Sequence, residues 1–273
     1  MTSPQANPLC GREATRIPLV VANWKGHGTG RAGAEFIKNL AQRLGETPDR
    51  EVLVAPSFPG LHQAIDAARG TTIVIAAQDV YAEKEAVRTW HGVPETLSGI
   101  GVKAVMVGQS DRRRLSNETD EVVGKKVRTA LEQGLLPILW VGEADADGRY
   151  GLTKWRLLGQ VRAAVEGVIP AEAARLAIAY EPKRTVDRGK TVDPEISQET
   201  AAFIRSCIFV VLGSHSARSV RLLCSGGVNA ENVDALMAQP DLDGVIVDGP
   251  ASLDVDHFLR IAQFEGATAD KVG

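Results

Sequence analysis

One carboxylate, Glu181, stands where a short apolar run gives way to a polar loop. The run covers Leu176 to Ala179, Pro182 follows the glutamate directly, and Gly189-Lys190-Thr191 closes the loop. A glutamate at the carboxyl end of a buried strand, followed by a proline that stiffens the exit and a glycine that could hinge a lid, suits a general base. A structural ion-pair partner is the alternative for Glu181, because perturbed carboxylates occur in both settings.

Two further polar positions follow apolar runs and supply charge and hydrogen-bond donors. Lys25, next to Asn23, would provide a fixed positive charge for an anionic substrate or an oxyanion. Taken alone, a lysine at a loop start is more often simply solvated. Gln109 opens the run Gln109-Ser110-Asp111-Arg112-Arg113, which offers an amide, a carboxylate and guanidiniums. The alternative for this run is a salt-bridge network that ties a loop to its strand.

Two glycine-containing turns, Ser225-Gly226-Gly227 and Asp248-Gly249-Pro250, follow later apolar runs. Backbone N–H groups in such turns can hold a phosphate, and Gly227 and Gly249 are therefore candidate substrate-binding residues. Each turn is weak evidence alone, because glycine-rich turns are ordinary loop chemistry. The five histidines and three cysteines show no metal-ligand spacing, so no metal, disulfide framework or metal-dependent catalysis is expected.

Buried strands and amphipathic helices alternate along the chain, which is the pattern of parallel βα units. Eight short apolar, β-branched runs are expected as strands: 18–22, 51–55, 72–76, 104–107, 135–141, 176–179, 221–224 and 244–247. Helical periodicity occupies the segments between and after them: 32–44, 61–68, 93–101, 120–133, 153–168, 193–212, 230–237 and 256–264.

These units predict an α/β protein with one domain, a closed (β/α)8 barrel over residues 17–265. A doubly wound open sheet is the rival architecture, but no Gly-x-Gly-x-x-Gly follows the first strand. Residues 1–16 are expected to form a flexible extension and residues 266–273 a flexible tail. In a barrel the candidate residues named above would all lie at the C-terminal ends of strands, where the chemistry of this fold is found.

Composition excludes several classes of function. The chain has 273 residues, a formal net charge of −3 and no basic cluster larger than Arg112-Arg113-Arg114, so nucleic-acid binding is not expected. The N-terminal residues lack an apolar signal region, and no apolar run is long enough to predict a membrane span. The cysteine pattern suits a reducing compartment, so a cytoplasmic protein without membrane partners is expected.

Together these segments resemble the triose-phosphate isomerase family, and the likeness runs from about residue 19 to residue 262. The matching segments are Ala22-Asn23-Trp24-Lys25, Ala77-Gln78-Asp79, Gly108-Gln109-Ser110-Asp111-Arg112-Arg113, Glu118-Thr119-Asp120-Glu121, Gly124-Lys125-Lys126-Val127, Val141-Gly142-Glu143, Ala179-Tyr180-Glu181-Pro182, Gly189-Lys190-Thr191 and Asp243-Gly244. The resemblance implies a TIM barrel that moves a proton between adjacent carbons of a small phosphorylated aldose or ketose through an enediol, without a cofactor.

The resemblance also implies roles for individual residues. Glu181 would be the base, Lys25 would stabilise the developing enediolate, and Asn23 would help hold its oxygens. Gly189, Gly227 and Gly249 would contribute to substrate binding. It implies a homodimer as well, in which the loop around Thr89 reaches the partner's active site.

Three departures from the family pattern bear on the activity. The electrophilic histidine of the family is replaced by Gln109, which can donate an N–H but cannot titrate. The family's phosphate-binding glycines are replaced at Asp187 and Asp248, whose charges would repel a dianion. The family's apolar, glycine-containing lid is replaced by Lys183-Arg184-Thr185-Val186-Asp187-Arg188. Lys183, Arg184 and Arg188 could offset the negative charge of the two aspartates.

Three functions therefore remain open at this point. The first is an aldose–ketose isomerase for dihydroxyacetone phosphate, glyceraldehyde 3-phosphate or a tetrulose phosphate. The second is a catalytically impaired paralogue with a ligand-binding or regulatory role. The third is an isomerase of a non-phosphorylated substrate. The retained Asn23, Lys25 and Glu181 favour the first, since a base and a charge stabiliser are needed before an ideal acid.

Overall fold

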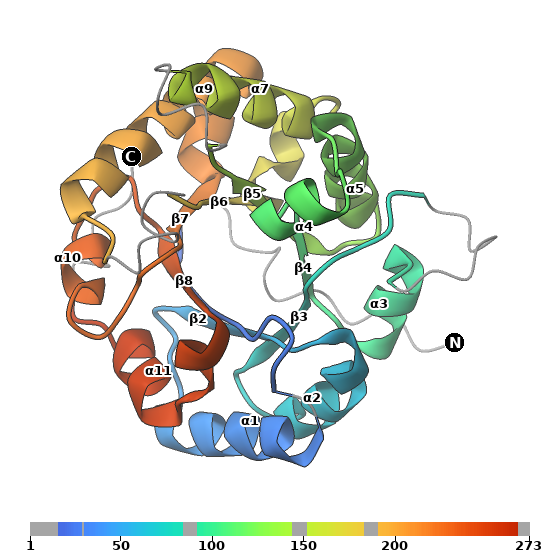
Figure 1. The fold of residues 1–273 in the computed structure, drawn as a ribbon, viewed down its shortest axis with the longest axis vertical. Helices are drawn as coiled ribbons and strands as arrows, with labels where there is room; N and C mark the ends of the chain where they lie inside the picture. Colours follow the sequence, from blue (N-terminus) through green and yellow to red (C-terminus); the bar gives the residue numbers. More distant parts are fainter. Residues whose placement is uncertain (1–15, 29, 84–91, 144–151, 183–190, 267–273) are drawn as a thin grey trace.

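Eight parallel strands close into a barrel in the computed structural model, which describes residues 16–28, 30–83, 92–143, 152–182 and 191–266. Figure 1 looks along the barrel, with helices around the strand ring. Each strand pairs with its sequence neighbour, and β8 pairs with β1, so the open-sheet alternative is wrong. The strands are β1 (Leu19–Asn23), β2 (Glu51–Ala55), β3 (Val74–Ala77), β4 (Ala104–Val107), β5 (Leu136–Val141), β6 (Ala177–Tyr180), β7 (Arg221–Cys224) and β8 (Gly244–Asp248).

The helices lie outside this ring, and all the predicted ones are present. They are α1 (Gly30–Leu44), α2 (Leu61–Ala68), α3 (Pro94–Ile100), α4 (Ser110–Leu115), α5 (Asp120–Glu132), α7 (Thr153–Val165), α9 (Pro194–Ser219), α10 (Val233–Met237) and α11 (Val255–Ala262). Short 3₁₀ helices occupy Phe58–Gly60, Pro170–Arg175 and Gly249–Leu253. The predicted domain boundaries stay predictions, because residues 1–15 and 267–273 lie outside the described residues.

Two helical features differ from the prediction. The segment after β4 was interpreted as a loop but forms the short helix α4. The sequence does not indicate this helix, because Arg112, Arg113 and Arg114 leave no apolar periodicity there. The helix predicted to end at Leu212 does end there, since the backbone at Gly213 is non-helical, and a further helical segment that was not predicted follows to Ser219, the end of α9. Glycine has no Cβ and therefore adopts the positive φ of 86° at this break without strain.

The strands are buried on both sides, as expected for parallel strands covered by helices. Successive side chains point alternately into the barrel and towards the helices. Leu19 and Val21 belong to the apolar cluster inside the barrel, while Val20 and Ala22 belong to the cluster between strands and helices. The alternation matters for the site, because a polar residue that continues the inward positions past a strand end must point into the barrel mouth.

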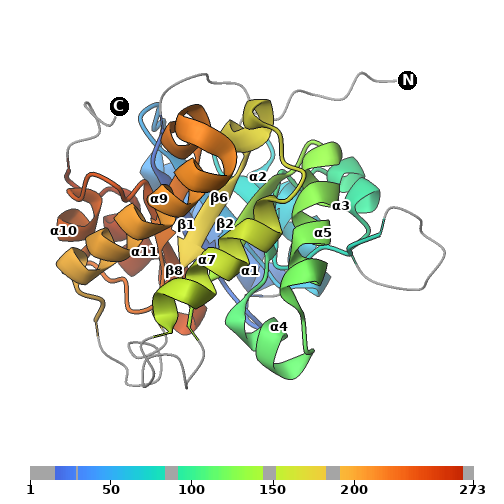
Figure 2. The same cartoon turned by 90° about the horizontal axis from the view of Figure 1, so that it is seen from above.

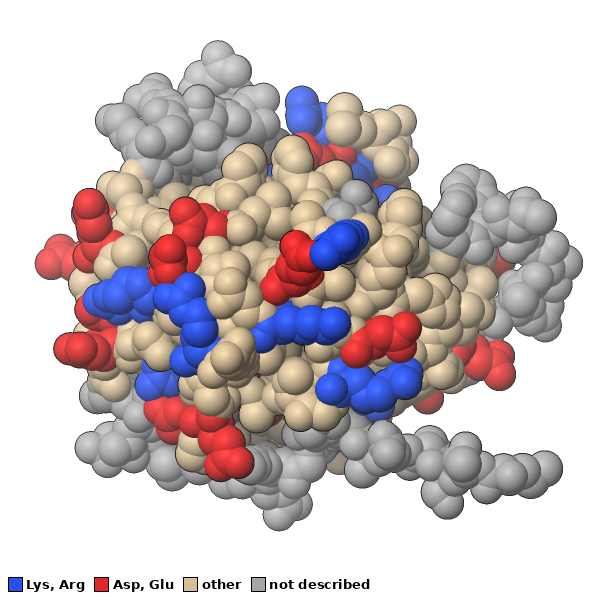
Figure 3. All heavy atoms as spheres, turned by 90° about the horizontal axis from the view of Figure 1, so that it is seen from below, with Lys and Arg blue, Asp and Glu red and all other residues tan. Residues whose placement is uncertain are grey.

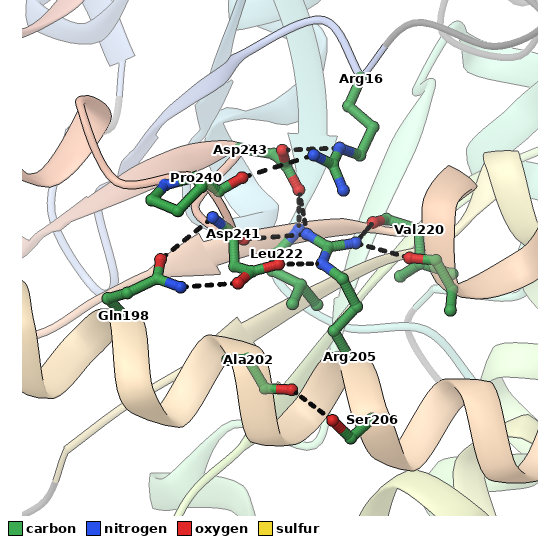
Figure 4. Close-up of polar contacts among 11 residues, drawn as sticks. Arg16, Gln198, Ala202, Arg205, Ser206, Val220, Leu222, Pro240, Asp241 and Asp243 are labelled. Carbon is green, nitrogen blue, oxygen red and sulfur yellow. Dashed lines mark hydrogen bonds and ion pairs between the residues drawn. The ribbon is translucent and has the colours of Figure 1, made fainter. Parts of the chain in front are cut away.

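A buried ion-pair network lies at the N-terminal ends of the strands and holds α9 to the segments before β7 and β8 (Figure 4). Arg205 of α9 donates to Asp241 at 2.6 Å, to Asp243 at 2.9 Å and to the carbonyl of Val220 at 3.1 Å. Asp243 is fully buried and also pairs with Arg16 at 3.1 Å. This network belongs to the end of the barrel that in this fold serves stability.

Among the described residues, α9 is the one helix long and apolar enough, by length and composition, to cross a membrane. Its place in the barrel accounts for that composition. It packs against α7, α10 and β7 in the outer layer, at the left of Figure 2, and Gly213 interrupts it. We therefore interpret α9 as a barrel helix. On the face drawn in Figure 3, acidic and basic side chains are interspersed, without a continuous basic field.

Candidate active site at the C-terminal end of the barrel

Polar residues continue the inward side of five strands at their C-terminal ends. Leu19, Val21, Ala76, Ala179, Leu223 and Ile246 point into the barrel, and two residues beyond the last of these on each strand stand Asn23, Gln78, Glu181, Ser225 and Asp248. Because side chains alternate along a strand, all five are directed into the barrel mouth. The sequence prediction that these strand ends meet is confirmed.

Asn23 and Asp248 are neighbours across the β1–β8 pair. They are matched in register, and the Asn23 Nδ2 donates to Asp248 Oδ1 at 2.8 Å. The same Nδ2 donates to Gln109 Oε1 at 3.2 Å. The hydroxyl of Ser225 donates to the other carboxylate oxygen of Asp248 at 2.9 Å. A continuous hydrogen-bonded chain therefore joins the ends of β7, β8, β1 and β4.

Gln109 reaches this chain because Gly108 turns the backbone at the end of β4. Gly108 has φ of 75°, and a Cβ there would lie 3.2 Å from the carbonyl oxygen of Trp140. Glycine is therefore the residue that suits both the turn and the close approach. The Gln109 Nε2 donates to the backbone carbonyl of Gln78 at 2.8 Å, which fixes its carboxamide from the other side.

Lys25 is the cation of the site in the described part of the chain. Its backbone has an unusual φ of 51°, and its carbonyl accepts a hydrogen bond of 2.7 Å from Gln78 Nε2. Gln78 also donates to the carbonyl of Ala55 at 2.9 Å, so one side chain ties the ends of β1 and β2. The Lys25 ammonium lies 3.9 Å from the Asp111 carboxylate, and the Lys25 side chain is 38% exposed. An exposed pair of this length leaves the ammonium available to a substrate.

Glu181 is buried at the end of β6, with 7% of its surface exposed. Its backbone N–H donates to the carbonyl of Val141 at 3.0 Å, which extends the β5–β6 pairing to the glutamate. Burial raises the pKa of the Glu181 carboxyl above its ordinary value, and the nearby charge of Asp248 acts in the same direction. A hydrogen bond from Ser110 and the charge of Lys25 oppose that rise.

The raised pKa of Glu181 predicts the acidic limb of the pH–rate profile. A base works only when deprotonated, so kcat/KM should fall as pH drops through the pKa of Glu181 in the free enzyme. We expect the midpoint of this limb above 4.5, the ordinary value for a glutamate. Titration of kcat/KM between pH 4 and pH 8 tests this, and a limb at or below 4.5 would contradict it.

The remaining sequence predictions have mixed outcomes. Gly249 is buried and Gly227 exposed, both with positive φ, beside the Asp248 and Ser225 strand ends. Gly189, Asp187 and the lid cations lie outside the described residues, as does the segment around Thr89. Among the described residues there is no group of histidine, cysteine or acidic side chains able to hold a metal.

Two contacts were not found by sequence reasoning. Ser110 was seen as one member of a polar run, yet its side chain lowers the pKa of the Glu181 carboxyl against the rise caused by burial. Ser225 was interpreted through its glycine neighbours as a phosphate cradle, whereas its side chain is buried and bonded to Asp248. The inward alternation of β7 would have indicated the second contact, but nothing local indicates the first.

A buried carboxylate base, a nearby ammonium and an orienting carboxamide at the mouth of a (β/α)8 barrel define an enzyme site suited to proton transfer next to a carbonyl. The comparisons give the family. A family model described as triosephosphate isomerase matches residues 18–265. The chain therefore belongs to the triosephosphate isomerase family, whose members are aldose–ketose isomerases.

Individual relatives agree over nearly the whole chain. A triosephosphate isomerase of Roseiflexus sp. (strain RS-1) is 42% identical, over 91% of this chain and 98% of the relative. One of Carboxydothermus hydrogenoformans is 38% identical over the same shares. The crystal structure of triosephosphate isomerase from Bartonella henselae superposes with a TM-score of 0.80 at 26% identity, covering 90% of this chain and 98% of that one.

Proposed function

We propose that the protein is a triosephosphate isomerase-like aldose–ketose isomerase that acts on a small sugar phosphate through an enediol. The observation that carries the proposal is the buried Glu181, with its raised pKa, in the same barrel mouth as Lys25. A base is needed to remove the proton on carbon, and a fixed positive charge is needed as the neighbouring oxygen becomes negative. Family membership supports dihydroxyacetone phosphate and glyceraldehyde 3-phosphate, or a related tetrulose phosphate, as substrates.

Each site residue has a role in this proposal. Glu181 takes the proton from one carbon and returns it to the next, Lys25 stabilises the enediolate, and Gln109 donates an N–H to the reacting oxygen. Asn23, Gly227 and Gly249 belong to the substrate-binding set, together with Gly189 by position in the family pattern. Because an amide does not titrate, the proton exchanged between the two oxygens passes through Lys25 or the substrate itself.

The oligomeric state and the cellular compartment of the protein are inferred from its family. We propose a homodimer in the cytoplasm, supported by relatives that match over nearly their full length. Sedimentation equilibrium tests the dimer, and a single species near 29.1 kDa, the mass of one chain, would contradict it.

The test of the activity is the exchange of solvent deuterium into substrate. An enediol-forming isomerase places deuterium on the carbon beside the carbonyl when dihydroxyacetone phosphate is incubated in D₂O. NMR would follow this exchange in parallel with a tetrulose phosphate, which ranks the two substrates. Absence of exchange into either compound, at enzyme concentrations comparable to substrate, would contradict the proposal and favour a non-phosphorylated substrate or a binding role.

Gln109→His provides a prediction specific to the altered electrophile. A histidine at this position can donate and accept a proton, and such general acid–base help is typically worth about 10² to 10⁴ in rate. We expect turnover of triose phosphate to rise towards the lower end of that range, about 10²-fold, measured as kcat. Unchanged kcat would mean that proton exchange between the oxygens does not limit the reaction, and would favour the second candidate, an impaired paralogue limited elsewhere.

A further inference from the structure

We propose that Asp248 is a positioning residue, which acts through Asn23 to fix the orientation of the Gln109 carboxamide. The inference rests on the proposed function and deepens it, because it explains how a glutamine is made a directed donor in this site. The proposal rests on two hydrogen bonds of the Asn23 Nδ2, one to Asp248 at 2.8 Å and one to Gln109 at 3.2 Å. They join side chains from three strand ends.

The orientation of Gln109 is determined by what lies at each end of its carboxamide. The backbone carbonyl of Gln78 can only accept, so the nitrogen of Gln109 must face it, at 2.8 Å. The oxygen of Gln109 then faces Asn23 and requires a donor there. The Asn23 Nδ2, at 3.2 Å, is that donor.

Asp248 also constrains the orientation of the Asn23 carboxamide, from the side opposite Gln109. Burial raises the pKa of the Asp248 carboxyl, and the charge of Lys25 with hydrogen bonds from Ser225 and Asn23 lowers it. In its ionised form the carboxylate can only accept, so Asn23 must also turn its nitrogen towards Asp248. If Asn23 were flipped, its oxygen would meet the oxygens of both Gln109 and Asp248, and its nitrogen would meet the backbone N–H of Lys25 that now approaches Asn23 Oδ1 at 3.4 Å. The carboxylate of Asp248 therefore leaves one orientation for both amides.

Asp248 is itself held in place. Ser225 is fully buried and donates its hydroxyl to the second carboxylate oxygen, at 2.9 Å. Register pairing of Asn23 with Asp248 across β1 and β8 fixes the backbone on both sides of their contact. The carboxylate is thus a rigid anchor rather than a mobile charge.

The consequence concerns which donor meets the substrate. An amide nitrogen carries two protons, and both protons of Asn23 are used, by Asp248 and by Gln109. Gln109 uses one proton on Gln78, and its other proton has no partner among the described residues. In this arrangement Gln109 presents the free amide N–H, and Asn23 serves substrate binding indirectly, by orienting Gln109.

The first test is a double-mutant cycle on kcat. Loss of the anchor in Asp248→Ala should misplace the Gln109 donor and lower kcat about 10- to 10²-fold with little change in KM, since small misplacements of a catalytic group cost this much. If Asp248 acts through Gln109, the same change should cost nothing further in the Gln109→Ala background. Asp248→Asn, whose carbonyl can still accept from Asn23, should retain most of the wild-type kcat.

Two kinetic outcomes would overturn the proposal. Additive losses in the cycle would show that Asp248 acts independently of Gln109. A lower KM with unchanged kcat would show that Asp248 acts on the charge of the substrate directly. Asp66→Ala, on the exposed face of α2, is the control for loss of an aspartate and should leave kcat and KM unchanged.

The second test does not depend on turnover. With ¹⁵N-glutamine labelling, the side-chain amide signals of Gln109 are identified by their absence in Gln109→Ala. In Asp248→Ala these signals should exchange faster with water and move towards the shifts of a free amide, and in Asp248→Asn they should not. Should Asp248→Ala fail to fold, Asn23→Leu, which removes both donors at similar volume, should give the same change.

The two tests separate the inference from the proposed function. If the wild type catalyses no deuterium exchange while the Gln109 signals respond to Asp248→Ala, the proposed function is wrong and the positioning role stands. If the wild type is active and the Gln109 signals are unchanged in Asp248→Ala and in Asn23→Leu, the positioning role is wrong.

Discussion

Glu181→Gln is expected to lower kcat by about 10⁴, the upper end of the range for general acid–base catalysis, because the reaction begins with removal of a proton by this residue. Glutamine keeps the volume of the side chain and leaves the backbone hydrogen bond from residue 181 to Val141 in place, so the fold and the site geometry should persist. Deuterium exchange into dihydroxyacetone phosphate, followed by NMR, should fall together with turnover.

The matched control is Glu35→Gln, which makes the same change at an exposed position on α1. It should leave both exchange and turnover at the wild-type rate, and circular dichroism should report folded protein for both variants. Exchange that persists in folded Glu181→Gln would show that another group is the base, and the mechanism proposed above would be wrong.

The barrel could be predicted because its strands are buried on both sides. Such strands appear as short apolar runs, as in Ala104–Val107 and Arg221–Cys224, where prediction and structure agree at both ends. Helix α4 could not be predicted in the same way. None of its six residues is fully buried and its one apolar residue, Leu115, is exposed, so the helix leaves no periodic apolar signal.

The position of the site could be predicted from the sequence, but the hydrogen-bond partners of its side chains could not. A strand end fixes where a side chain points, and that was enough to bring Asn23, Glu181 and Asp248 to one mouth. The partner of each side chain depends on the stagger between strands and on rotamers, which local sequence does not contain. That Asp248 repels a phosphate stays a prediction, while its hydrogen bonds from Asn23 and Ser225 are visible only in the structure.

The second large effect concerns stability. Arg205→Leu should lower the free energy of unfolding by about 3–5 kcal/mol, the usual cost of removing one partner from a buried ion pair. Arg205 donates to two carboxylates and to the backbone carbonyls of Ala217 and Val220, and its removal leaves the fully buried Asp243 with Arg16 as its ionic partner. Urea titration followed by circular dichroism measures the loss as a lower midpoint.

Arg218→Leu is the control on the same helix, because Arg218 is exposed near the end of α9. Exposed substitutions of this kind usually change stability by less than about 0.5 kcal/mol. The network lies at the N-terminal ends of the strands, at the opposite end of the barrel from Glu181 and Lys25. Folded Arg205→Leu should therefore keep the wild-type KM at low temperature.

Two outcomes would contradict these expectations. A midpoint equal to that of Arg218→Leu would show that Arg16 alone is enough to compensate the buried charge of Asp243. A raised KM in the folded protein would instead show that the network positions the catalytic end of the barrel.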